Sequence, residues 1–215
     1  MEYKVQAQSA EKYKNSSYIS PRRWSSYAIQ VREAMLAKPE KILEIGPGNG
    51  IVTNILKNMG FHVETLDFDS RIPVDHVGSI TDEKVVEKLA EKFDLVLACQ
   101  IFEHIKYEDF IKAIGILKKI APKVIISLPH TEKNSRFFYF ALKMPLIKSL
   151  TFAKKIIFKQ IAYEFNGEHY WEIGTQGYAL SRVIADLKTS GWCIDKHFFN
   201  PDNPYHYFFV LSQKS

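Results

Sequence analysis

The chain has 215 residues, 46% of them hydrophobic and 25% charged, so it can build one substantial core, and an intrinsically disordered chain is excluded. Two cysteines, Cys99 and Cys193, are too few for a disulfide framework and favour a reducing, cytoplasmic location, and we see neither a secretory signal nor a transmembrane run of about 18 apolar residues. The net charge of +5 is matched by residues 131–165 alone, where seven basic residues stand against two acidic ones, so a basic surface for nucleic acid over the whole protein is not expected.

Helices and strands are expected to alternate along the first part of the chain. The expected strands are short, apolar and rich in β-branched residues, which is typical of a parallel sheet covered by helices on both faces. The helices are predicted from apolar residues at helical spacing and from stops at proline or glycine. The predicted helices lie between Pro21 and Pro39 and at 51–59, 81–93 and 107–120, and the predicted strands at 41–45, 61–68, 73–77, 94–100 and 123–128.

This alternation breaks at Pro129. A long insertion follows, and the chain then resumes with a predicted helix at 175–191 and an antiparallel pair at 192–199 and 205–212.

Within the insertion, residues 137–165 are both basic and apolar. Placed on a helix from Leu146, they align Lys148, Lys155 and Lys159 on one stripe opposite an apolar face. Three roles stay open for this segment: a lid packed on the core with its lysines outward, a surface that binds an apolar or anionic acceptor, or a helix lying on an anionic membrane.

The stretch KILEIGPGNG, residues 41–50, carries Gly46, Gly48 and Gly50 between a predicted strand and a predicted helix. Backbone N–H groups at such a junction face a ligand. A P-loop is excluded, because no Gly-Lys-Ser/Thr follows, and the third glycine of a dinucleotide fingerprint would fall at Ile51 or Thr53. The loop therefore indicates a ligand that lays a carboxylate and an amino group, and no phosphate, along these glycines.

The order ILEIGPGNG, VETLDFD, VGSI and FDLVLACQIFEHI resembles the class I, Rossmann-like S-adenosylmethionine (AdoMet) dependent methyltransferases. The resemblance covers roughly residues 41–130. It implies an α/β fold with a seven-stranded, mostly parallel sheet, helices on both faces and an antiparallel C-terminal strand. We expect one domain over 1–215, with a helical cap at 1–38 and a helical insertion or lid after the fifth strand at 131–174.

The resemblance also implies which residues bind AdoMet. Glu44 matches the acid that orders the glycine loop near the amino end of the ligand. Asp67, 23 positions later, matches the acid that accepts hydrogen bonds from both ribose hydroxyls, which suits the two oxygens of a carboxylate; Asp69 is a weaker contender. Ser79 stands where an aspartate is commoner at the adenine edge. The other residues expected to contact AdoMet are Gly46, Gly48, Gly50, Phe68, Ile80, Cys99 and Gln100.

Methyl transfer is an in-line displacement, so the protein mainly supplies alignment and a dry site, and a base is needed only for a protonated acceptor. Two histidines, His104 and His130, follow the fourth and fifth strands, where the ligand edge of such a sheet lies. Each is a candidate base; otherwise His104 caps or packs the helix that follows it, and His130 is a polar loop residue. The segment GEHYWEIG offers His169, Tyr170 and Trp171, which either line the acceptor pocket or pack the insertion on the core. The spacing of His, Cys and Asp indicates no metal site.

These observations predict a methyltransferase acting on oxygen or nitrogen of a small-molecule, lipid or glycan-type acceptor. Nucleic acid is not an expected partner. ACQI stands where an Asn-Pro-Pro-Tyr type motif would indicate methylation of adenine in DNA, and the long insertion and the lack of a nucleic-acid-binding module argue against RNA. Tyr18, Arg22 and Arg23 in YISPRRW are either a lid over the cofactor or part of a docked surface helix. The alternative is a catalytically idle AdoMet-fold module that docks on a membrane or a protein through residues 137–165.

Overall fold

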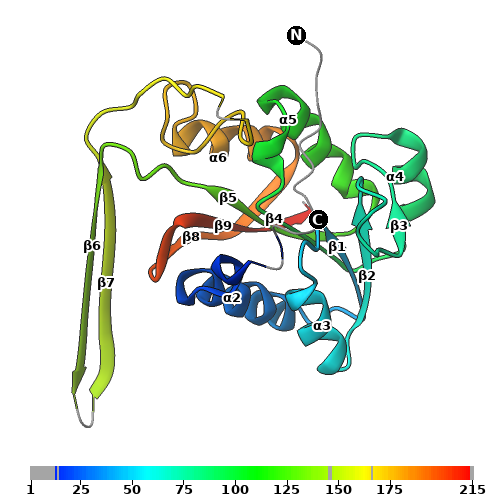
Figure 1. Ribbon diagram of the computed structural model, residues 1–215, viewed down its shortest axis with the longest axis horizontal. Coiled ribbons are helices and arrows are strands. Elements are labelled where there is room, and N and C mark those ends of the chain that lie inside the picture. The colour runs from blue at the N-terminus through cyan, green and yellow to red at the C-terminus, as the bar shows by residue number, and fades with distance from the viewer. Residues whose placement is uncertain (1–12, 14, 145–146, 166, 214–215) are drawn as a thin grey trace.

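The computed structural model describes residues 13, 15–144, 147–165 and 167–213, and within these ranges its central sheet has seven strands in the order β3-β2-β1-β4-β5-β9-β8 (Figure 1). The first five strands of that order are parallel, and β9 runs antiparallel between β5 and β8. This confirms the predicted mostly parallel sheet with its antiparallel C-terminal strand. The strands are β1 Lys41–Ile45, β2 His62–Asp67, β3 His76–Val77, β4 Leu95–Cys99, β5 Lys123–Pro129, β8 Trp192–Asn200 and β9 Asn203–Gln213.

Helices cover both faces of the sheet, as Figure 1 shows. Helices α2 and α3 pack on one face, where Ala34 and Leu56 meet Ile42 of β1. On the other face, the chain buries Phe110 and Leu43 in a larger cluster. Because neighbouring residues of β1 are buried on opposite faces, its sequence reads as a continuous apolar run. The helical elements are η1 Ser16–Ile19, α2 Pro21–Ala37, α3 Ile51–Asn58, α4 Glu83–Leu89, η2 Phe102–His104, α5 Tyr107–Ile116, η3 Leu117–Lys119 and α6 Leu180–Thr189.

Strand β1 lies between β2 and β4, so the order of the sheet reverses there. Helices leave the carboxyl ends of β1 and β4 in different directions at such a switch point, which opens a crevice for a ligand. The glycine loop follows β1, and the IFEHI segment follows β4. The fold therefore brings these two motifs to the same edge of the sheet.

The N-terminal helix is fixed at its start and along one side. The Ser20 hydroxyl accepts the Arg23 N–H at 3.4 Å, and Pro21 takes the first helical position. Buried Ser26 accepts a hydrogen bond from the Asn200 amide at 2.9 Å, which ties α2 to the turn between β8 and β9. These hydrogen bonds fix the position of the start of α2 relative to the central sheet.

The insertion after β5 differs from the prediction. Residues predicted as helical form a β-hairpin, β6 Ser135–Met144 paired antiparallel with β7 Ile147–Ile157. The aromatic residues of β6 and the β-branched residues of β7 favour this extended pairing. The helix on which Lys148, Lys155 and Lys159 were predicted to form a stripe is therefore wrong, and in the strand Lys154 and Lys155 point to opposite faces.

The hairpin projects away from both layers of the molecule (Figure 1). Several of its aromatic side chains are more than half exposed, including Phe138, Phe140 and Phe152. At its base, the Phe137 ring meets the Phe199 ring of β8 at 5.5 Å. The Lys155 ammonium donates to the carbonyl oxygens of His130 at 2.6 Å and Pro204 at 2.9 Å. These contacts fasten the base of the hairpin to β5 and β9.

We expect Lys155→Met to lower the free energy of unfolding by about 2 kcal/mol, because two carbonyl groups lose a charged donor. Burial lowers the pKa of Lys155 to about 8 but leaves it largely charged at neutral pH. Urea denaturation measures the effect. Lys154→Met is the matched control, since Lys154 is exposed, and it should change stability by less than about 0.5 kcal/mol. Equal losses in the two variants would contradict the anchoring role.

Candidate active site

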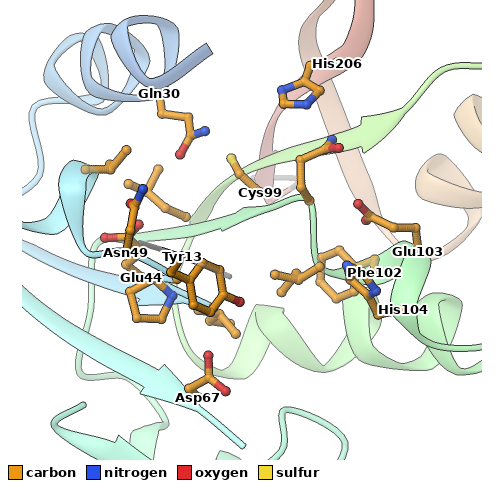
Figure 2. Close-up of a pocket in the computed structure, with 18 of the residues that line it drawn as sticks. Tyr13, Gln30, Glu44, Asn49, Asp67, Cys99, Phe102, Glu103, His104 and His206 are labelled. Carbon is orange, nitrogen blue, oxygen red and sulfur yellow. The ribbon is translucent and has the colours of Figure 1, made fainter. Parts of the chain in front are cut away.

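A cavity of about 630 Å³ opens at the carboxyl ends of β1, β2 and β4. Figure 2 shows Glu44, Asn49 and Asp67 on one side of it and Glu103 and His104 on the other. This volume is typical of a ligand site. The cavity is lined both by the glycine loop and by residues after the hairpin, so segments far apart in sequence form one site.

The glycine loop is shaped for close approach. Gly46 has φ +68° and its N–H donates to the Leu66 carbonyl at 2.8 Å; a Cβ there would collide with Ile101. Gly48 has φ +56°, and a Cβ would lie 3.1 Å from the Tyr13 ring. Both glycines line the cavity as predicted. Gly50, also predicted as a ligand contact, lies outside it, where its positive φ begins α3.

Glu44 is a buried residue of β1, two positions before Gly46 of this loop. Its carboxylate accepts a hydrogen bond from the Thr53 hydroxyl of α3. Burial raises the pKa of Glu44 to about 7, and the Thr53 hydrogen bond partly opposes that shift. The lining of the cavity therefore includes a carboxyl group that titrates near neutral pH.

From this raised pKa we expect AdoMet to bind about tenfold more tightly at pH 8 than at pH 6, because the ionised share of Glu44 rises from roughly a tenth to nine tenths. An ionised carboxylate attracts the cationic ligand. Conversely, the folded state binds the Glu44 proton more tightly than the unfolded chain, so this group makes stability fall as pH rises from 4.5 to about 7. Calorimetric titrations at several pH values measure the affinity. Glu44→Gln should flatten the profile, and an unchanged slope would disprove the assignment.

Asp67 and Asp69 both line the cavity but differ in their contacts. Asp69 is bound by Arg71, which donates to both of its carboxylate oxygens at 2.8 and 2.7 Å. Asp67 accepts the Asp69 N–H at 2.9 Å, and burial raises its pKa. Asp67 is therefore the better candidate for a ligand hydroxyl, in line with the sequence-based prediction.

The end of β4 forms the floor of the cavity. Cys99 lines it, and burial raises the pKa of its thiol to about 12, so the sulfur stays protonated. Gln100 has φ +57°, an uncommon value for a residue other than glycine, and its side-chain amide donates to the Ser127 hydroxyl at 3.3 Å. Phe68, Ser79 and Ile80 line the cavity as well.

The N-terminal segment forms part of the cavity wall. Tyr18, Arg22 and Arg23 line the cavity, the position expected of a lid. An ion pair of 2.6 Å joins Arg22 to Glu132, beyond the end of β5. The Tyr13 ring lies against Gly48, and neither it nor this ion pair was predicted from sequence.

Glu103, His104 and His169 meet at the end of the cavity away from Glu44. The His104 Nδ1–H donates to the Glu168 carbonyl at 2.9 Å, and the His104 and His169 rings contact at 4.9 Å. Burial raises the pKa of the Glu103 carboxyl. Of the predicted acceptor-end residues, His104 and His169 thus lie at the cavity.

His130 does not line the cavity. It is buried in the corner between β5 and β9, and its backbone N–H donates to the Tyr205 carbonyl at 2.6 Å. Burial, together with the nearby Lys155 charge, lowers the pKa of His130 to about 3. Its predicted position as a base at the ligand is therefore wrong, because the strand pairing buries it.

Tyr170 and Trp171 also lie away from the cavity, contrary to one reading of their sequence. Trp171 is fully buried, and its indole N–H donates to the Ile105 carbonyl at 3.1 Å. The Tyr170 ring packs 4.6 Å from Phe165. These two aromatics pack the insertion on the core, whereas their neighbours Glu168 and His169 line the cavity.

Tyr205 and His206 line the cavity and were not predicted. A signal for them existed, because an antiparallel last strand begins beside the carboxyl end of β5; the register pairs Pro129 with His206. Tyr205 donates to Glu172 at 2.6 Å. Burial lowers the pKa of His206 to about 3, so it is neutral in the cavity.

A glycine loop at the switch point and an acid at the end of β2 define the class of Rossmann-like methyltransferase sites. The family described as a methyltransferase domain matches residues 20–171. The chain belongs to this family. No curated protein sequence matches the chain.

Solved structures of distant sequence share this fold. The 1,6-didemethyltoxoflavin N1-methyltransferase of Burkholderia thailandensis superposes with a TM-score of 0.61 at 13% identity, covering 96% of this chain and 84% of that one. The methyltransferase domain of a bacterial CtHen1 gives 0.59 at 14% identity, with 89% and 99% covered. The glycopeptide N-methyltransferase MtfA, complexed with AdoMet, gives 0.53 at 14% identity, with 86% and 93% covered. At this identity the likeness establishes the fold.

Proposed function

We propose that the chain is an AdoMet-dependent methyltransferase that methylates oxygen or nitrogen of a small-molecule, lipid or glycan-type acceptor. The observation that carries the proposal is a single cavity that joins the glycine loop and Asp67 to the polar group around His104. Two neighbours in fold are named for N-methylation of a small molecule and of a glycopeptide, which supports an acceptor of this size.

The part of the cavity formed by the glycine loop and the end of β2, the donor half, offers groups that suit each part of AdoMet. Glu44 would meet the ammonium group, Asp67 would accept from the ribose hydroxyls, and Phe68 and Ile80 would flank the adenine. Gly46 and Gly48 line the cavity with positive φ, and this loop would pass beside the methionine part. When bound, AdoMet supplies a methyl group on a cationic sulfur, and transfer forms a bond to the acceptor atom while the S–C electron pair stays on sulfur.

The acceptor half is proposed to lie where Glu103, His104 and His169 meet. The proton of an acceptor hydroxyl or amine has to be lost at that end, and these titratable groups line it. Arg22 and Glu132 line the same cavity as an ion pair, and they would help to exclude water from the reaction.

Calorimetric titration with AdoMet and with NAD tests the donor assignment, and we expect micromolar binding of AdoMet only. An acceptor screen over phenols, sugars, lipids and amines, monitored by release of S-adenosylhomocysteine, then tests the reaction. Binding of NAD in place of AdoMet would refute the proposal.

Contact with an anionic membrane through residues 137–165 stays a prediction. Within the described part of the chain, no helix combines the length and apolar character needed to cross a bilayer. Co-sedimentation with anionic vesicles, compared with neutral ones, measures such contact.

A further inference from the structure

Three potential metal ligands converge at the acceptor end of the cavity. Glu103 and His104 belong to η2, directly after β4, whereas His169 arrives from the segment beyond the hairpin. One donor atom from each residue lies within 4.8 Å of the other two. This juxtaposition was invisible in the sequence, where the spacing indicated no metal site.

Glu103 is an unusual residue for such a position. It is 1% exposed, and its Oε2 has no hydrogen-bond partner among the described residues. A buried carboxylate oxygen left unpaired is costly, and native proteins rarely keep one without a ligand, an ion or a catalytic reason. Figure 2 shows the Glu103 carboxylate near His104, at the far end of the site from Asp67.

The two histidines have the hydrogen bonds that metal-binding imidazoles usually make. The His104 Nδ1–H donates to the Glu168 carbonyl at 2.9 Å, and the His169 Nδ1–H donates to the Glu172 carboxylate at 3.3 Å. A carbonyl or carboxylate on Nδ1 fixes the ring and the tautomer, with the lone pair on Nε2. Glu172 is itself oriented by the Tyr205 hydroxyl at 2.6 Å.

The backbone also holds the cluster together. The Tyr170 N–H donates to the Glu103 carbonyl at 2.8 Å, which joins the segment of His169 to η2. Ligands of a transition-metal ion lie about 2.0–2.2 Å from it, so side-chain adjustments of about an ångström bring these donors into range.

We propose that Glu103, His104 and His169 bind one divalent ion of the Mn²⁺, Fe²⁺, Co²⁺ or Zn²⁺ class, with open positions that face the acceptor. Two imidazoles and one carboxylate suit these ions better than Mg²⁺ or Ca²⁺, which prefer oxygen ligands only. All three residues line the same cavity as the donor half.

The role of the metal ion toward the acceptor rests on the proposed function. A bound cation lowers the pKa of a hydroxyl that coordinates it, so the acceptor proton passes to water near neutral pH before the methyl group arrives. His104 is then a metal ligand and not the base. The favoured acceptor is a hydroxyl with a second oxygen beside it, since two oxygens fill two open positions.

The test uses the full chain, stripped with a chelator and titrated with Co²⁺ while visible absorption is recorded. We expect one equivalent to bind, and Glu103→Gln and His169→Gln each to weaken binding about 100-fold; Glu172→Gln should weaken it about tenfold through the orientation of His169. The matched control is His62→Gln, because His62 lies 3.2 Å from Glu64 at the surface and could hold Co²⁺ adventitiously.

Two results would overturn the proposal: no Co²⁺ binding by the unsubstituted chain, or binding that survives Glu103→Gln and His169→Gln but falls with His62→Gln. AdoMet titration of each variant checks that it folds, since the donor half is unaltered. Co²⁺ binding without AdoMet binding would refute the proposed function and leave the metal site intact; the reverse would refute the metal site alone.

Discussion

Trp171→Ala is expected to lower the free energy of unfolding by about 4 kcal/mol. The side chain is fully buried, and its ring packs against Tyr107 at 4.8 Å and Phe110 at 5.1 Å. Its removal leaves a large cavity and an Ile105 carbonyl without its donor. Chemical denaturation measures the loss, which is a large share of the stability of a typical domain.

The matched control is Trp24→Ala, because Trp24 is 50% exposed on α2 and should change stability by less than about 1 kcal/mol. Trp171→Phe should recover part of the loss, since it keeps most of the ring volume. If Trp171→Ala left stability unchanged and abolished acceptor binding alone, Trp171 would belong to the acceptor site after all.

Asp67→Ala is expected to weaken AdoMet binding on the order of 100-fold, or about 3 kcal/mol, because two hydrogen bonds to a charged acceptor are lost. The folded protein should not lose stability, since burial already disfavours the ionised Asp67. Isothermal titration calorimetry gives the affinity, and thermal unfolding without ligand gives the stability.

Asp69→Ala is the matched control for the loss of AdoMet affinity in Asp67→Ala. Asp69 lies two residues away and lines the same cavity, but Arg71 holds both of its oxygens. We expect a change in affinity below about fivefold. A larger effect at Asp69 than at Asp67 would reverse the assignment of the ribose partner.

The parallel part of the fold was predictable because its signals are local. A run such as KILEI is buried on both faces, and the observed β1 has the predicted bounds. The hairpin was not predictable in the same way. In a segment where apolar residues dominate, helical and extended periodicity both fit, and the pairing of Ser135 with Ile157 depends on contacts distant in sequence. Its phenylalanines and β-branched residues were the one local indication.

In the candidate site, the donor-side residues were predictable from sequence and the acceptor-side arrangement was not. The donor-side residues Glu44, Gly46, Gly48 and Asp67 lie in motifs whose order is fixed by consecutive strands, and all four line the cavity. On the acceptor side, neither the proximity of His169 to Glu103 nor the burial of His130 can be deduced from spacing. Both depend on how the chain returns from the hairpin to the sheet.

This path of the chain separates the acceptor-side residues after the hairpin from the residues of the glycine loop. One continuous stretch, from Thr131 to Thr175, leaves β5 and comes back to it, and Thr131 donates its N–H to the Ile173 carbonyl at 2.9 Å where the two ends meet. The stretch carries His169 and Glu172 but none of the glycine loop. Replacing this stretch by another sequence is therefore expected to change the acceptor and to leave the binding of the methyl donor unchanged.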